Sequence, residues 1–275
     1  MSEIKLDRLS ALLEGLAPLV TLGLVSEIRV DGAPNRDNET DLQLFFLTRG
    51  DAELKVNGTR QKIESPALIA VHANQPFVFH RFSAKDACRL VAARVQLTGP
   101  VATLFLEEFT QPRTVFLGED EPALHLVVTM IESELDTPRC GQPALLNRAG
   151  DILFICLLRY LVAHPGAEDG GLFNGLADPR IAKALVAMHK RPAFGWDLEL
   201  LANEAGMSRT AFATKFHKTM RRPPGKYLAA IRLALAQRAV DLGRGLKEAA
   251  KVAGYKNSSA LSRALAKSRV TVPAN

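Results

Sequence analysis

The sequence has little of what stabilises secreted proteins and lacks the long apolar runs that cross membranes. It contains three cysteines in 275 residues, Cys88, Cys140 and Cys156, with no Cys-x-x-Cys pair. Three widely spaced thiols do not make a disulfide framework, so we expect reduced cysteines and a cytoplasmic protein. The longest apolar stretch, 152–163, carries Arg159 and predicts a packed helix, not a membrane span. The first residues mix acidic and basic side chains and lack the layout of a signal peptide.

The motifs of several enzyme classes are also missing. The chain has no Gly-x-Ser-x-Gly, no P-loop and no Gly-x-Gly-x-x-Gly sequence. Of its six histidines, His125, His164 and His189 have no partner at catalytic spacing, and no His-x-His pair occurs. We therefore expect no enzymatic activity and no cofactor.

Positive charge is concentrated at the C-terminal end. Residues 1–178 hold 16 Lys and Arg against 24 Asp and Glu, whereas residues 179–275 hold 19 against 5. The whole chain carries a formal net charge of +6, so an acidic first part is joined to a strongly basic last third. A segment of such excess charge attracts polyanions, and double-stranded DNA is the partner we expect. A merely solubilising surface does not explain why the charge lies in one third.

The spacing of apolar residues changes twice along the N-terminal part of the chain. Residues 4–16 have leucines at helical spacing, and residues 26–96 contain short strand-like runs separated by turns, including the Asn57-Gly58 dipeptide of a hairpin. This pattern predicts a small antiparallel barrel or sandwich. Helical periodicity returns over 124–135 and 145–162, which predicts a helical hairpin that could serve as a dimer face. The Gly- and Pro-rich stretch that follows predicts a linker over 166–177, between domains at 1–165 and 178–275.

The basic segment contains a helix-turn-helix pattern. Asp178 and Pro179 are a start signal for one helix, and Asp197 caps a second, short one. Gly206 permits the turn, and Ser208 caps the next helix, on which two phenylalanines four residues apart form a buried face. The outward face of this helix predicts base and phosphate contacts by Arg209, Thr210, Ala213, Thr214, Lys215 and Lys218.

The same layout recurs about 48 residues later. Gly254 takes the place of Gly206, Asn257 that of Ser208, and Leu261 and Leu265 those of the two phenylalanines. One helix, 224–242, joins the two units, which would place two reading helices about one DNA turn apart. The outward face of the second helix is formed by Ser258, Ser259, Ser262 and Arg263. We expect Arg263 either to contact guanine or to brace the second unit against the connecting helix.

These features in order resemble the AraC/XylS-type DNA-binding domain over residues 178–273. The matching sequences are DPRI, WDLELLA, AGMSRTAF and AGY, together with Pro224, Tyr227, Arg232, Ala236 and Pro273. Where that family has a glycine before each closing proline motif, Arg221 and Val270 stand in this chain. The resemblance implies a dimeric transcription regulator that acts on RNA polymerase, with a small effector controlling its binding to DNA.

The first part resembles the cupin-like sensor domain of one AraC subgroup, a β-barrel followed by a helical hairpin. The chain as a whole is therefore expected to be α+β, with an all-α C-terminal domain of two helix-turn-helix units. Phe45 and Phe77 stand where that subgroup often has metal-binding histidines, so we expect no metal. Phe45, Phe77, Phe79 and His80 either line a pocket for a small hydrophobic effector or simply pack the core.

Two other functions are compatible with the pattern. A cupin metalloenzyme fused to a DNA-binding domain would contain stoichiometric iron or nickel. A DNA-compacting protein would bind no sequence much more tightly than bulk DNA. Cys88, beside Asp86 and Arg89, is interpreted either as a redox-sensitive thiol or as an inert buried cysteine.

Overall fold

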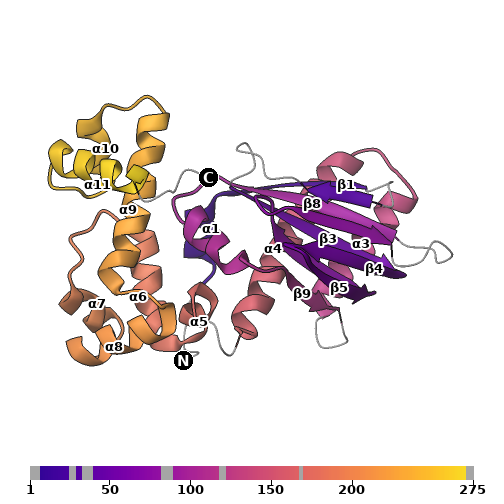
Figure 1. Ribbon diagram of the computed structural model, residues 1–275, viewed down its shortest axis with the longest axis horizontal. Helices are drawn as coiled ribbons and strands as arrows, with labels where there is room; N and C mark the ends of the chain where they lie inside the picture. The colour runs from indigo at the N-terminus through magenta and orange to yellow at the C-terminus, as the bar shows by residue number, and fades with distance from the viewer. Residues whose placement is uncertain are drawn as a thin grey trace. The chain divides into compact units, whose positions relative to one another are not determined.

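The computed structural model describes residues 7–24, 29–32, 40–81, 89–117, 122–166 and 170–270. The chain separates into two compact units (Figure 1). One comprises residues 17–98 and 106–161, and the other residues 1–16, 99–105 and 162–275. Cys88 lies outside the described residues, whereas Cys140 is exposed and Cys156 is buried.

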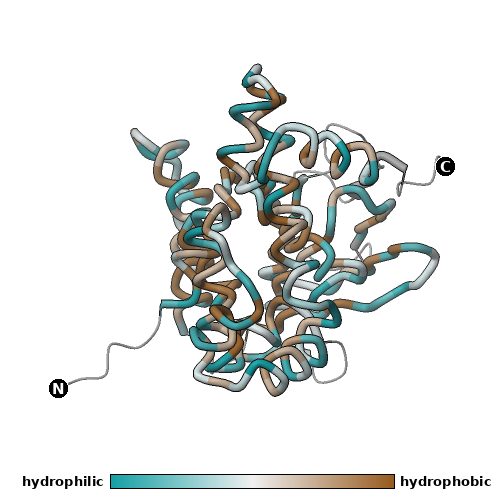
Figure 2. The backbone as a smooth tube through the Cα atoms, turned by 90° about the vertical axis from the view of Figure 1, so that its left-hand side faces the viewer, coloured by the Kyte–Doolittle hydropathy of each residue, from teal (hydrophilic) through white to brown (hydrophobic). Residues whose placement is uncertain are grey.

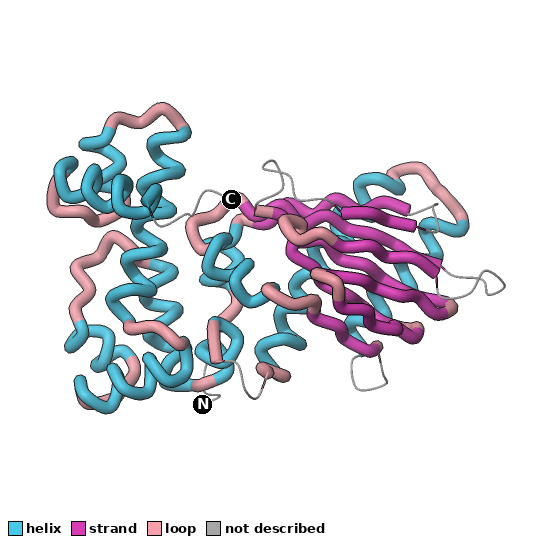
Figure 3. The backbone as a smooth tube through the Cα atoms, viewed as in Figure 1, coloured by secondary structure: helices cyan, strands magenta, loops and turns pink. Residues whose placement is uncertain are grey.

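The first unit is built on two antiparallel sheets. One has the strand order β1 (Pro18–Leu24), β8 (Arg89–Leu97), β3 (Asp41–Arg49), β6 (Ala67–His72) and β9 (Arg113–Phe116). The other has the order β2 (Arg29–Gly32), β7 (Phe77–Arg81), β4 (Asp51–Val56) and β5 (Thr59–Glu64). Figure 3 shows these strands in magenta. The predicted barrel or sandwich is thus realised as two facing sheets, and Asn57-Gly58 forms the β4–β5 hairpin.

An apolar core fills the space between the sheets. Successive side chains of a strand point to opposite faces, so alternate residues of β3 and β7 point inward. Phe45 lies between Phe77, in edge-to-face contact at 5.3 Å between ring centroids, and Phe79, stacked at 5.4 Å. The cluster is completed by small and branched residues, Leu47, Ala52, Leu54, Val56, Ile63, Ala67, Ile69, Val71 and Leu90.

Two long helices follow the strands, as predicted. α3 spans Pro122–Asp136 and α4 spans Gln142–Ala163, joined by the turn that contains Cys140. α4 packs on β1, because a Cβ atom at Gly150 would lie 2.7 Å from Cγ1 of Val20. The short helix α2 (Ala102–Leu106) and the 3-10 turn η2 (Glu107–Phe109) lead into β9. None of the helices in the described ranges combines the length and apolarity of a membrane span.

The second unit is helical throughout. It contains α1 (Ser10–Leu16), most of α2, α5 (Leu172–Ala177), α6 (Pro179–Lys190), α7 (Leu198–Glu204), α8 (Arg209–Met220), α9 (Pro224–Asp241), α10 (Leu246–Val252) and α11 (Ser258–Val270). In Figure 2 hydrophobic and hydrophilic residues alternate along these helices, as amphipathic helices require.

Two segments near the expected domain boundaries pack against the helices of the second unit. Helix α5 lies inside the predicted linker 166–177, because Leu172, Phe173 and Leu176 bury their side chains against α6 and α8. Helix α1, predicted as part of the first domain, packs against α6, and Arg8 donates hydrogen bonds to the carbonyl oxygens of Leu176 (2.9 Å) and Ala177 (3.2 Å). The Gly- and Pro-rich composition of 166–177 predicted a linker, but the burial of Leu172, Phe173 and Leu176 makes part of it a packed helix.

Candidate nucleic-acid interface

The first helix-turn-helix unit is formed by α7 and α8. The Asp197 carboxylate accepts the N–H of Leu200 at 2.8 Å and begins α7, and the Ser208 hydroxyl accepts the N–H of Ala211 at 3.4 Å and begins α8. Gly206 has a φ of 62°, a conformation that glycine adopts without the strain of a side chain. Phe212 and Phe216 are fully buried, so the opposite face of α8 is turned outward.

The second helix-turn-helix unit repeats these features with α10 and α11. Gly254 has a φ of 74°, and Asn257 Oδ1 accepts the N–H of Ala260 at 2.8 Å at the start of α11. Leu261 is fully buried and Leu265 nearly so. The predicted N-caps Asp178, Asp197, Ser208 and Asn257 are therefore all confirmed.

The connecting helix α9 belongs to both cores. Its first half gives Tyr227 and Ile231 to the first unit, and its second half gives Ala236 and Ala239 to the second. Tyr227 also donates or accepts a hydrogen bond with Nε2 of the buried His189 at 2.7 Å. Burial lowers the pKa of His189 to about 4, so this histidine is neutral at physiological pH.

Most of the predicted reading residues lie on the outward faces. Arg209, Thr210, Thr214 and Lys218 on α8, and Ser259, Ser262 and Arg263 on α11, are exposed, whereas Ala213, Lys215 and Ser258 are half-buried. No hydrogen bond or ion pair links Arg263 to another residue in the described ranges. Its side chain is exposed at the outward face of α11.

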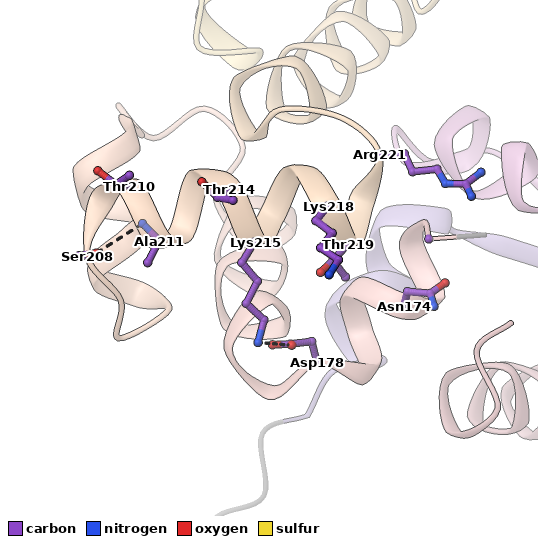
Figure 4. Close-up of a pocket in the computed structure, with 11 residues that line it drawn as sticks. Asn174, Asp178, Ser208, Thr210, Ala211, Thr214, Lys215, Lys218, Thr219 and Arg221 are labelled. Atoms are coloured by element: carbon purple, nitrogen blue, oxygen red, sulfur yellow. Dashed lines mark hydrogen bonds and ion pairs between the residues drawn. The ribbon is translucent and has the colours of Figure 1, made fainter. Parts of the chain in front are cut away.

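Lys215 lies differently from the expectation that it points to phosphate. Its Nζ is 2.6 Å from Oδ2 of Asp178, the residue that caps α6 (Figure 4). Burial opposes ionisation of the Asp178 carboxyl, but hydrogen bonds from Lys215 and from the N–H groups of Ile181 and Arg180 outweigh it and lower its pKa. The sequence missed this pair because 37 residues separate its members.

Two hollows flank α8. A groove of about 1040 Å³ lies on the side of α5 and α6, and a smaller hollow of about 570 Å³ lies beside the start of α9. Thr214 lines both, so it stands on the ridge between them. The smaller hollow is lined mainly by carbon atoms, from Leu198, Ala213, His217, Pro223, Pro224 and Gly225. Apolar contacts of this kind suit the methyl group of thymine in a major groove.

Comparison with known families assigns both parts of the chain. The cupin family model matches residues 7–163, more than half of the chain, and a helix-turn-helix domain model matches residues 201–274. The chain belongs to the cupin family, and its C-terminal part matches a helix-turn-helix domain.

Relatives of this cupin and helix-turn-helix protein are named as regulators. It is 34% identical over 156 residues to an AraC-like transcription regulator of Streptomyces lividans, which covers 55% of this chain and 51% of that protein. It is 28% identical over 123 residues to the HTH-type transcriptional regulator MtrA of Neisseria gonorrhoeae, covering 44% and 41%. The chain thus spans about half the length of the curated relatives it matches. A structure of ToxT from Vibrio cholerae with an unsaturated fatty acid is 11% identical, covers 91% of each chain and has a TM-score of 0.37.

The described residues of the cupin domain do not offer the ligands of a first-row metal. Over the described ranges, no three His, Cys, Asp or Glu side chains lie together in a way that could hold a metal ion. Phe45 and Phe77, at the expected ligand positions, are buried in the apolar core. An imidazole and carboxylate set is what such a metal requires, so these residues do not fit one.

The cluster predicted as an effector pocket is only partly brought together. Phe45, Phe77 and Phe79 share the inner face, but His80 lies on the other face of β7, with Nε2 3.4 Å from Oε1 of Glu53. His80 therefore does not share the inner face with the three phenylalanines. The two-residue period of a strand was the signal that separates His80 from Phe77 and Phe79.

Proposed function

We propose that this protein is a sequence-specific, DNA-binding transcription regulator that reads bases with α8 and α11. The observation that carries the proposal is the duplication. Two capped helices each bury one apolar face and present hydroxyl and cationic side chains on the other, within a segment that holds 19 basic against 5 acidic residues.

The reading residues of the proposal are Thr210 and Thr214 on α8 and Ser259 and Arg263 on α11. All four are exposed, within about two turns of a helix N-terminus, where side chains reach base edges in a major groove. Arg263 makes a bidentate contact to guanine in this proposal, because a guanidinium matches the two acceptors of that base, and the contact is worth about 1–3 kcal/mol of discrimination. Lys218 contacts phosphate.

Regulation is assigned to the cupin domain. A small hydrophobic effector would enter among the inward-facing phenylalanines by displacing part of their packing, and would alter how the helical unit engages DNA. Homodimerisation through α3 and α4 is supported by their exposed apolar residues, with Leu126 68% and Met130 40% exposed one turn apart. The protein then contacts RNA polymerase at a promoter in the reducing cytoplasm, where the exposed Cys140 stays a thiol.

No enzymatic activity is proposed, since the relatives are named as regulators. Elemental analysis of the purified protein tests this point. One equivalent of iron or nickel would instead support a cupin metalloenzyme.

The test of the proposed function is selection of bound fragments from genomic DNA, followed by titration at several salt concentrations. A regulator is expected to select a defined sequence, with a log–log salt slope of about −5 if about six phosphates are neutralised. Equal affinity for all fragments would indicate DNA compaction, and a slope near zero would refute DNA binding.

A further inference from the structure

The groove beside α8 is built partly from residues outside the helix-turn-helix match. One wall is the face of α8 with Ser208, Thr210, Ala211, Thr214, Lys215, Lys218 and Thr219, and Arg221 follows at its end. The other wall is Gly170, Asn174 and Asp178 (Figure 4). The second wall is held in place, since the N–H of Gly171 donates to the carbonyl oxygen of Thr219 at 2.8 Å and Asn174 Nδ2 donates to that of Gly166 at 3.0 Å.

The charges of this groove favour an anion. Lys215, Lys218 and Arg221 line it against a single carboxylate, Asp178. Asp178 and Lys215 neutralise each other at 2.6 Å, and Lys218 is exposed beside them. The hydroxyl group of Thr219 adds an uncharged donor along the same helix face.

Arg221 occupies a backbone position that a side chain disfavours. Its φ of 52° lies in the left-handed region, where glycine is the residue without strain. The arginine side chain lies against Gly170, whose added Cβ atom would be 3.1 Å from Cγ of Arg221. The chain thus places a cation at the end of the groove at a conformational cost.

A major groove about 12 Å wide accommodates one helix, so the strand that borders it must pass close beside α8. We propose that the groove holds the sugar–phosphate backbone of this DNA strand, and that Asp178 limits the affinity for DNA of any sequence by holding Lys215 away from phosphate. The inference rests on the proposed DNA binding and adds the segment 170–178 to the interface. Lys218 and Arg221 then contact phosphate directly.

The test is Asp178→Asn in the full-length protein, with titration of a random-sequence duplex. Asparagine retains the capping of α6, so only the charge changes. We expect about three- to tenfold tighter binding at moderate salt and a salt slope steeper by about one, because Lys215 becomes a phosphate contact. Asp241→Asn is the matched control, since Asp241 ends α9, bonds Gln237 and does not line the groove.

Two further variants distinguish an effect at the groove from a general effect of net charge on DNA binding. In a Lys215→Gln background, Asp178→Asn is expected to leave the salt slope unchanged, because no lysine is released. Arg221→Gly is expected to melt at or above the wild-type temperature, yet bind the duplex more weakly with a slope shallower by about one. Lys190→Gln, at the end of α6, is its charge-matched control.

The proposal is overturned if Asp178→Asn binds no better than wild type while its melting temperature is unchanged, or if Asp241→Asn gives an equal gain. It is also overturned if Arg221→Gly retains wild-type affinity and slope. Should Asp178→Asn fold poorly, Arg221→Gly decides alone. If the wild-type protein binds no DNA in the same titration, it is the proposed function that fails.

Discussion

The two helix-turn-helix units differ in what fills their cores. In the first, Phe212, Phe216 and Tyr227 pack together with ring centroids 5.5 and 6.1 Å apart. In the second, the corresponding space is filled by small residues, Ala236, Ala239, Ala249, Ala250 and Ala253, around Leu261 and Leu265. Caps and a glycine turn therefore define the layout of both units, while the size of the core varies.

The second helix-turn-helix unit packs against the loop 191–196, which precedes α7 of the first helix-turn-helix unit. Arg232 on α9 donates to the carbonyl oxygens of Pro192 (2.8 Å) and Phe194 (2.6 Å), which fixes the loop 191–196. Gly254 of the second turn lies so close that an added Cβ atom would be 2.7 Å from the Cα of Ala193. By contrast, a Cβ atom at Gly206 would meet nothing within 4 Å. The turn at Gly254 in the second helix-turn-helix unit therefore packs against the loop, whereas the turn at Gly206 in the first has open space around it.

The largest expected effect follows from this contrast. Gly206→Ala should lower the free energy of unfolding by about 1–2 kcal/mol, the cost of a side chain in the left-handed conformation. Gly254→Ala incurs the same cost and must also move the backbone of Ala193, so we expect a total loss of about 3–5 kcal/mol. Urea unfolding of both variants measures the difference. Equal losses in the free energy of unfolding would show that the turn at Gly254 does not pack against the loop 191–196.

Acid should weaken the first helix-turn-helix unit more than the second, because residues 245–270 of the second contain no histidine. His189 is 8% exposed and its pKa is lowered from 6.5 to about 4, so the unfolded chain takes up a proton before the folded one. Stability is then constant above pH 6.5, falls as pH drops towards 4 and levels off below it, by about 3 kcal/mol in all. Hydrogen exchange resolved by helix measures this. His189→Gln should remove the dependence in this window, and equal acid sensitivity of α11 would contradict the assignment.

Much of the helical unit could be predicted from the sequence because its signals are local. A cap residue and the helix it begins lie within three positions, and so do the glycines of the turns. Asp178, Asp197, Ser208 and Asn257 were found in this way. The strand-rich first part was predicted for the same reason, by turn residues and short β-branched runs.

The features that were missed depend on contacts between distant residues. The Asp178–Lys215 pair, the packing of α5 on α8 and the contact of Gly254 with Ala193 each join segments that no periodicity connects. His80 is an exception, since strand alternation alone placed it opposite Phe77 and Phe79. The contact of α1 with α6 joins helices more than 160 residues apart and carries no sequence signal.

A smaller effect is expected at the helix starts. α7 begins with Asp197, whose carboxylate caps the helix, but α10 begins with Gly245, which has no side-chain cap. Gly245 has an extended conformation, with φ −65° and ψ 152°, and an added Cβ atom meets nothing within 4 Å. Gly245→Asp should therefore raise the free energy of unfolding by about 0.5–1 kcal/mol, through a cap and a less flexible unfolded chain. Chemical denaturation measures it, and a loss of stability would show that α10 starts elsewhere.

The central claim, that both units read bases, is tested most directly by Thr214→Ala and Arg263→Ala on a panel of single-base variants of the selected operator. The account predicts that each variant relaxes preference at its own position, about 10 base pairs apart, with a loss of about 1–3 kcal/mol for Arg263→Ala. The melting temperatures should stay near that of wild type, because both side chains are exposed. Uniform weakening across the panel, together with a lower melting temperature for Arg263→Ala, would contradict the claim.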